Sequence, residues 1–312
     1  MKHLARFILV ALLFTIPFTA CKKEAGIVSD PKIMVEAKNL TDVAYGSDPS
    51  QKMDVYLPTN RDLNTKVVIF VHGGSFIEGD KSYFTTLVKE LVRAGFAVLN
   101  VNYRLVDATG IYDLPVKHLK SAVTIKDQVN DMNTVVDYAI AHAKEWQVSD
   151  SKLAIAGHSA GATLALLYAY DVKNTGKVKA VANLAGSLDQ TIIDIPFYYF
   201  LLPDAIMEVA YRYTGYEVSA ATDVYYRAIS PLYVANAAQK IPTLNIFPEL
   251  NDLNGLPKQG RSTFDAFTAK LNSLNVPNKF VMVAGADHEF NKLGAFDTVL
   301  NETIAYFNAN LN

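Results

Sequence analysis

The sequence predicts an α/β fold in which a mainly parallel β-sheet carries helices on both faces. Strand-like and helix-like stretches alternate along its 312 residues, the pattern typical of parallel strands joined by helical crossovers. Half of the residues are apolar and 19 % are charged, which suits a large buried core and excludes a disordered or fibrous chain.

The predicted strands are short apolar runs, and the most continuous of them are typical of strands buried on both faces. They cover residues 53–57, 66–71, 96–103, 152–156, 178–184, 244–247 and 279–283. The predicted helices carry apolar residues at helical spacing or consist of good helix formers. They cover residues 83–93, 127–145, 162–170, 205–213 and 296–307.

The N-terminal residues have a different character from the rest of the chain. Residues 1–6 are basic and residues 7–18 are apolar, a run shorter than the ~20 residues that a membrane-spanning helix needs. This pattern predicts an export signal over residues 1–20. The stretch FTAC, residues 18–21, resembles a bacterial lipobox. That resemblance implies a lipid on Cys21 and a protein anchored in the cell envelope, at the outer membrane or cell surface; without the lipid it would be periplasmic or secreted.

The remaining chain is predicted to form a tether over residues 21–35 and one domain over residues 36–312. Residues 187–235 interrupt the alternation, because about fifty residues are too many for a simple crossover between strands. This insertion contains a strongly apolar and aromatic stretch at residues 192–203. It is expected to form either an additional core helix or a lid (cap) that lines an apolar pocket.

Charge and cysteine content limit the partners and the source of stability. The formal net charge is −2 and no basic cluster lies beyond the predicted export signal, which argues against nucleic acid as a partner. Cys21 is the only cysteine, so the chain cannot form an internal disulfide and its fold must depend on its core. The sequence does not indicate an oligomeric state.

The stretch GHSAG, residues 157–161, lies between a predicted strand and a predicted helix. A sharp turn at this place can project the Ser159 hydroxyl into a pocket, provided that small residues at positions 157 and 161 avoid clashes. The alternative is close packing of a helix on a sheet, for which small residues are also common. Because of its position between strand and helix, Ser159 is the candidate nucleophile.

The second motif is FVHGGSF, residues 70–76, at the end of a predicted buried strand. Acyl transfer passes through an oxyanion that needs two or more backbone N–H donors nearby. The amides of Gly73, Gly74 and Ala160 are the candidate donors, since glycine permits close approach. The alternative is an ordinary glycine turn capped by His72.

A serine nucleophile also needs a base and a group that orients this base. His288 follows the last predicted strand and is the candidate base; the other histidines are expected in the signal, in the oxyanion loop, beside the nucleophile, or on polar surfaces. Asp252 follows the strand at residues 244–247 and is the candidate acid. Glu249 and Asp287 are alternatives, and Asp252 could instead be a turn residue.

With these residues in the order Ser159, Asp252, His288, the chain from residue 51 onward resembles the α/β-hydrolase superfamily. VHGGSF, VLNVNYRL and GHSAG look like the carboxylesterases with a His-Gly-Gly oxyanion loop, either hormone-sensitive-lipase-like or feruloyl/acetyl xylan esterase-like. Two departures are present: Ser75 replaces a third glycine, and Phe247-Pro248 replaces the usual His-Gly before the acid. The departure at Phe247-Pro248 leaves the choice of the triad acid open.

The resemblance implies a serine esterase that forms an acyl-serine intermediate and needs no metal or organic cofactor. The expected substrate is a small-molecule or polysaccharide-linked ester, with a short acyl group or a carbohydrate alcohol. Three alternatives remain open at this point. The same residues could serve an amidase or peptidase, the fold could be a catalytically inactive binding module, or the aromatic insertion could serve a lipase at a membrane surface.

Overall fold

The computed structural model describes residues 35–193, 204–254 and 258–312, except for the side chains of residues 252–254. The predicted export signal, residue 21 and most of the predicted tether lie outside these residues. Most of the apolar stretch at residues 192–203 also lies outside them.

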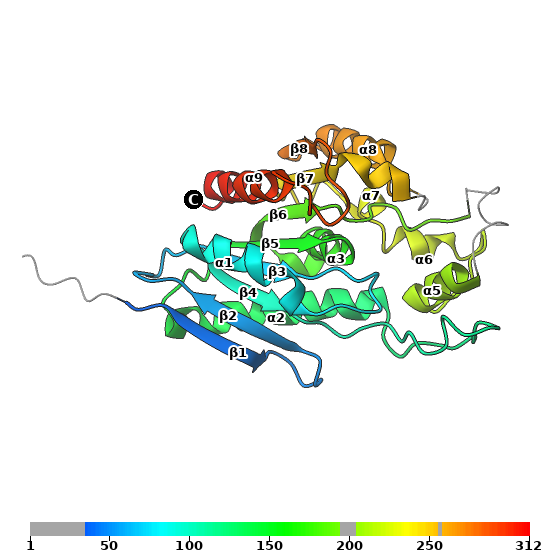
Figure 1. Ribbon diagram of the computed structural model, residues 1–312, viewed down its shortest axis with the longest axis horizontal. Helices are drawn as coiled ribbons and strands as arrows, with labels where there is room; N and C mark the ends of the chain where they lie inside the picture. The colour runs from blue at the N-terminus through cyan, green and yellow to red at the C-terminus, as the bar shows by residue number, and fades with distance from the viewer. Residues whose placement is uncertain (1–34, 194–203, 255–257) are drawn as a thin grey trace, which may run out of the picture. The chain divides into compact units, whose positions relative to one another are not determined.

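An eight-stranded sheet forms the centre of the domain, in the order β1-β2-β4-β3-β5-β6-β7-β8 (Figure 1). The first two strands are antiparallel to their neighbours, and the other six run parallel. The strand bounds are β1 Lys38–Ala44, β2 Lys52–Leu57, β3 Val67–Val71, β4 Ala97–Val101, β5 Leu153–His158, β6 Val178–Leu184, β7 Thr243–Pro248 and β8 Asn278–Val283. The predicted mainly parallel sheet is therefore confirmed.

Helices cover both faces of this sheet, as predicted. Buried side chains of α1 and α9 pack with one face, and those of α2, α3 and α8 pack with the other. The bounds are α1 Thr85–Arg93, α2 Ile125–Trp146, α3 Ala160–Ala169, α5 Asp204–Thr214, α6 Asp223–Arg227, α7 Pro231–Val234, α8 Arg261–Ser273 and α9 Ala295–Asn310. Short 3-10 turns occur at η1 Lys81–Phe84, η2 Val172–Asn174 and η3 Glu249–Asn254. Among the described residues, no helix has the length and apolar composition of a membrane-spanning segment.

Among the strands and α-helices, β1, α8 and the short helices α6 and α7 of the insertion were not predicted. β1 is mostly exposed, so its sequence KNLTDVA lacks the apolar alternation of a half-buried strand. Helix α8 buries only four of its residues among many polar ones, which leaves a weak helical pattern. Both lie toward the margins of the core, where the apolar pattern is weakest.

The described part of the insertion contains α5, α6 and α7. Arg212 of α5 is fully buried and fixes this helix against the loop that follows β4. Its guanidinium donates to the carbonyl oxygens of Asp107 at 2.7 Å and Lys117 at 2.7 Å, and to Glu208 Oε1 at 2.6 Å. Burying a guanidinium without hydrogen-bonding partners is costly, so these bonds favour one position of α5 against this loop.

The parallel register brings two predicted motifs together. Val71, the last residue of β3, pairs with Gly157 near the end of β5. The loop that begins at His72 therefore emerges beside the turn that carries Ser159. This is the carboxyl edge of the parallel strands, where α/β folds commonly bind ligands.

Candidate active site

Ser159 lies at the sharp turn between β5 and α3. Its backbone has φ 51° and ψ −122°, a conformation that a residue with a Cβ rarely adopts. A Cβ at Gly161 would lie 2.3 Å from the carbonyl oxygens of Val71 and His72, and one at Gly157 would lie 2.4 Å from the Gly161 carbonyl. The glycines of GHSAG therefore allow the turn to fit against β3 and the helix.

The His288 imidazole meets this serine from the loop after β8. Its Nε2 lies 2.9 Å from Ser159 Oγ, a hydrogen-bonding distance for a base that accepts the hydroxyl proton. The two residues are 129 positions apart in the chain. The structure thus brings together the nucleophile and base candidates that the sequence indicates.

The other nitrogen of His288 contacts a residue that was not predicted. Nδ1 lies 2.7 Å from Oδ1 of Asn251, in η3. Asp252, the predicted acid, belongs to the same turn, but its side chain lies outside the described residues. The only sequence signal for Asn251 is its position beside Asp252 in the loop that follows β7.

The two alternative acids are bonded elsewhere. Glu249 Oε2 accepts a hydrogen bond from the Gly285 N–H at 2.7 Å. Asp287 Oδ1 accepts one from the Asn291 N–H at 2.9 Å. Both carboxylates therefore hold loops of the site in place, and neither is bonded to His288 in this structure.

The environment of His288 favours its neutral form. Burial, followed by the nearby His158 ring, lowers the pKa of His288 to about 4, while Glu289 and Asp287 act in the opposite direction. Burial also lowers the pKa of His158 to about 4. The imidazole is therefore unprotonated at neutral pH, the state in which it can accept a proton from serine.

The oxyanion loop, residues 72–78, packs directly against the serine turn. A Cβ at Gly73 would lie 3.1 Å from the Ser159 Cβ, and Gly74 adopts φ 119°, which strongly favours glycine. Among the described residues, the N–H groups of Gly73, Gly74 and Ala160 donate no backbone hydrogen bond outside regular helices and strands. Gly73 and Gly74 line the same cavity as Ser159, and Ala160 follows Ser159 directly in the chain, so all three remain the candidate oxyanion donors.

His72 is part of the support of this loop. Its ring stacks on Tyr103 with centroids 4.5 Å apart, and its Nδ1 lies 2.6 Å from the Gly73 carbonyl oxygen. The Tyr103 hydroxyl donates to the His72 carbonyl at 3.1 Å. Burial lowers the pKa of His72, so this ring is neutral and structural.

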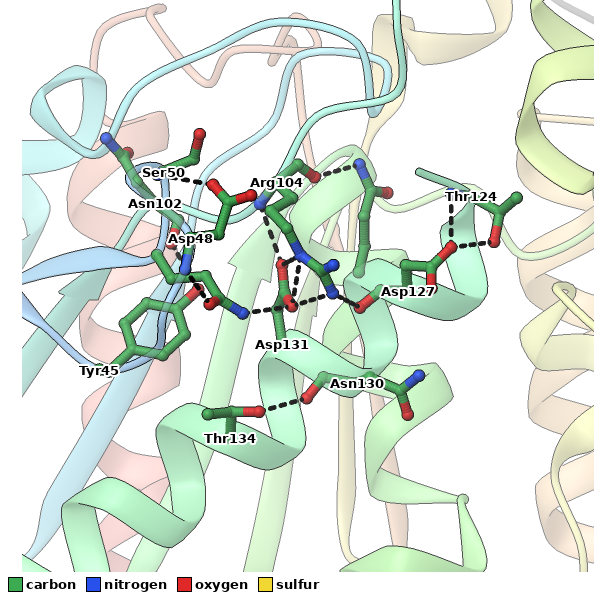
Figure 2. A network of polar contacts seen from close by, with 12 residues as sticks. Tyr45, Asp48, Ser50, Asn102, Arg104, Thr124, Asp127, Asn130, Asp131 and Thr134 are labelled. Carbon is green, nitrogen blue, oxygen red and sulfur yellow. Dashed lines mark hydrogen bonds and ion pairs between the residues drawn. The ribbon is translucent and has the colours of Figure 1, made fainter. Parts of the chain in front are cut away.

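Polar side chains of α2 and α5 support the oxyanion loop and the residues after β4. Arg104 faces Asp131 of α2 (Figure 2), and its Nη2 lies 2.6 Å from Asp131 Oδ1. One turn away, Gln128 Nε2 donates to the carbonyl oxygens of both Phe76 and Arg104 at 2.8 Å. Tyr213 of α5 completes the support, because its hydroxyl donates to the Ser75 carbonyl at 2.8 Å.

Two cavities open around these groups. The larger has a volume of about 860 Å³ and contains Ser159, His288, Gly73 and Gly74 in its wall; the rest of its lining is mainly polar and aromatic. These include Glu78, Tyr83, Phe84, Glu289, Asn291 and Phe296. The smaller, about 250 Å³, is mainly apolar and lies beneath α5. Ser75 and Gln259 line both cavities, so the two cavities are neighbours.

One cluster near Ser159 has metal-ligating side chains. His158, His288 and Glu289 each offer one ligand atom, all within 4.8 Å of one another. Both ring nitrogens of His288 are hydrogen-bonded, and His158 Nε2 lies 2.8 Å from the His288 carbonyl oxygen. A metal ion bound by the His288 ring would therefore replace its contact with Ser159 or Asn251.

The last two described histidines lie outside this cluster. His118 Nδ1 lies 2.9 Å from Glu208 Oε2 of α5, and His142 stacks on Tyr138 with centroids 3.9 Å apart. The first contact ties the loop after β4 to the insertion, and the second lies on α2. Neither histidine lines the larger cavity.

The part of the chain that carries the oxyanion loop and Ser159 is similar to known proteins. Residues 53–195, which include the oxyanion loop and Ser159, match the BD-FAE family. The kynurenine formamidase of Danio rerio is 32 % identical over 161 residues, which are 49 % of this chain and 47 % of that protein. The isoprenylcysteine alpha-carbonyl methylesterase ICME of Arabidopsis thaliana is 28 % identical over 123 residues, 39 % of this chain and 26 % of that protein. The chain thus spans less than half the length of these relatives.

Solved structures share the fold over most of the chain. A truncated carbohydrate esterase from gut microbiota superposes with a TM-score of 0.68 at 18 % identity, covering 88 % of this chain and 97 % of the other. The carboxylesterase EstE1, cloned from a metagenomic library, gives 0.67 at 20 % identity, covering 89 % and 90 %. A bacterial heroin esterase gives 0.66 at 21 % identity, covering 91 % and 87 %. The chain therefore shares the fold of these esterases, and its residues 53–195 match the BD-FAE family.

Proposed function

We propose that the protein is a serine hydrolase that cleaves carboxylic esters through an acyl-serine intermediate. The observation that carries this proposal is the 2.9 Å contact between Ser159 Oγ and His288 Nε2, beside the glycine loop. The match to an esterase-type family supports the reaction class.

The geometry supports the following sequence of steps. His288 Nε2 accepts the Ser159 proton while Oγ attacks the ester carbonyl carbon. The developing oxyanion accepts hydrogen bonds from the Gly73, Gly74 and Ala160 amides. Collapse of the tetrahedral intermediate breaks the bond to the alcohol oxygen, which takes the proton from His288. Water then attacks the acyl-serine in the same way and releases the acid and free Ser159.

The two cavities favour an ester with a polar alcohol and a small acyl group. The larger cavity offers Glu78, Glu289 and Asn291 as hydrogen-bonding partners, together with exposed Tyr83. Such a lining suits a sugar or another polyhydroxylated alcohol. The apolar cavity of about 250 Å³ suits a short acyl chain or one aromatic ring. Esters of carbohydrates are thus the preferred substrate class.

The nucleophile is tested by Ser159→Ala. The substitution removes the attacking oxygen and a small volume at a turn, so the protein is expected to stay folded. Hydrolysis of p-nitrophenyl acetate should fall by more than ~100-fold, as is usual for a triad serine. A smaller loss, with the circular dichroism spectrum unchanged, would exclude Ser159 as nucleophile.

An amidase is the second candidate, because the matched region resembles proteins named kynurenine formamidase. The same serine and histidine could attack an amide, but the leaving amine is less readily expelled than an alkoxide. Comparing kcat/KM for phenyl acetate with that for formanilide and acetanilide decides between the two. A higher value for either amide would favour the amidase.

We also infer that the protein is exported and held in the bacterial envelope by a lipid on Cys21. The support is the basic and apolar N-terminal sequence followed by FTAC at residues 18–21. Expression of the full chain in a bacterium fed radiolabelled palmitate tests this. Label on the wild type but not on Cys21→Ala is expected, and an unlabelled wild type would contradict it.

A further inference from the structure

The position of the Asn251 amide is fixed from both sides. Its Nδ2 donates to the Gln259 carbonyl oxygen at 2.6 Å, and its Oδ1 lies 2.7 Å from His288 Nδ1. A carbonyl oxygen can only accept, so the amide nitrogen must face Gln259 and the amide oxygen must face the imidazole. Asn251 is also buried, with 3 % of its surface exposed.

This orientation determines the tautomer of His288. Because Asn251 Oδ1 can only accept, His288 carries its proton on Nδ1 and donates it to Asn251. The Nε2 lone pair then points at Ser159 Oγ, 2.9 Å away. An asparagine in this place therefore supplies the same orientation of the ring that an aspartate supplies in the usual Ser-His-Asp set.

We infer that Asn251 is the positioning residue for His288, so that the reacting set of this chain is Ser159, His288 and Asn251. The inference rests on the proposed hydrolase function. An asparagine differs from an aspartate in one respect, since it carries no charge with which to stabilise the imidazolium formed during attack. Among the residues that the structure describes, the charged or titratable groups that act on the ring are then His158 from β5 and Asp287 and Glu289 from its own loop.

The test compares Asn251→Ala with Asn251→Asp and Asp252→Asn, using kcat and KM for p-nitrophenyl acetate from pH 4 to 9. Asn251→Ala should lower kcat on the order of 10²-fold with little change in KM, because the ring loses its orientation but the cavity is intact. Asn251→Asp keeps the acceptor for Nδ1 but loses the donor to Gln259, so it should recover part of kcat. Its carboxylate should also move the acid limb of the pH profile upward by about one pH unit or more.

Asp252→Asn separates the two neighbouring residues, and the inference predicts less than ~10-fold loss of kcat for it. Asn278→Ala is the matched control, because Asn278 begins β8 at the opposite end from His288 and bonds Asn272 Oδ1 at 2.8 Å. It should behave as wild type.

The inference is overturned if Asp252→Asn loses more than ~10-fold in kcat, or if folded Asn251→Ala keeps kcat within ~10-fold of wild type. Should Asn251→Ala fail to fold, an unshifted acid limb in Asn251→Asp overturns it. These results are distinct from failure of the proposed function, in which the wild-type protein itself hydrolyses neither ester nor amide.

Discussion

Ser159 and His288 show how much of a catalytic site a sequence can reveal at the scale of single residues. Ser159 is recognisable because its turn needs glycine on both sides, and the structure shows that a Cβ at Gly161 would lie 2.3 Å from carbonyl oxygens of the neighbouring strand. His288 is recognisable because it follows the last parallel strand. The first signal is steric and the second is the order of the elements, and both can be recognised from the sequence.

Asn251 could not be found in the same way. Its role depends on the path of η3 and on the Gln259 carbonyl oxygen that fixes its amide. The neighbouring Asp252 carries the charge that a sequence reading expects, and nothing in the stretch ELND distinguishes the two positions. Only the contact of 2.7 Å with His288 Nδ1 indicates Asn251.

The protonation of His288 leads to a prediction for pH dependence. His288 must be neutral to accept the serine proton, and burial together with His158 lowers its pKa to about 4. The value of kcat/KM should therefore be nearly constant from pH 7 down to about 5 and fall as the pH passes through about 4. Gas chromatography of the ethanol released from ethyl acetate measures this without a titrating chromophore or a titrating product. A decline centred near pH 6.5, the value of an unperturbed histidine, would contradict it.

At the scale of secondary structure, the apolar pattern determines what could be predicted. Buried strands such as β3 (VVIFV) and residues 153–157 of β5 are evident because every residue is apolar, small or both. β1 and α8 were missed because they bury few side chains and so carry little pattern. Helix α5 was predicted from its sequence, but its attachment through buried Arg212 depends on distant carbonyl groups and required the structure.

The link between α2 and the oxyanion loop gives a second prediction. Gln128→Leu removes the donor to the Phe76 and Arg104 carbonyl oxygens, of which the first bond is buried and the second partly buried. The free energy of unfolding should fall by about 1–3 kcal/mol. kcat should also fall, because the loop that carries Gly73 and Gly74 loses one support. Urea unfolding and esterase assays measure the two effects.

Thr134 provides the control on the same helix. Its hydroxyl donates to the Asn130 carbonyl within α2 at 3.0 Å, away from the loop. Thr134→Ala should therefore change stability by less than about 0.5 kcal/mol and leave kcat unchanged. Equal effects of the two substitutions would show that α2 does not support the loop.

At the scale of the whole domain, buried neutral histidines link stability to pH. The pKa values of His158 and His288 are lowered to about 4 in the folded protein, whereas an unfolded histidine titrates near pH 6.5. Between these values the unfolded chain binds more protons than the folded one. The contribution of these two histidines to the free energy of unfolding should therefore be fully present above about pH 6.5 and be lost as the pH falls toward 4.

Thermal unfolding followed by circular dichroism tests this linkage. Between pH 7 and pH 5 the midpoint should fall by roughly 5 °C, given the size of the domain. Salt should have little effect on this decline, since burial is the largest cause of both shifts. A midpoint that is constant or rises over this range would contradict the assignment of neutral buried imidazoles.

The central claim is that His288 activates Ser159 for covalent attack, and mass spectrometry of a fluorophosphonate adduct tests it most directly. The described domain should gain one phosphonyl group, located on the peptide that contains Ser159. The rate of labelling should fall by more than ~100-fold in His288→Ala, and Ser159→Ala should not be labelled at this peptide. A folded wild-type protein that stays unlabelled, or one labelled at another serine, would contradict the claim.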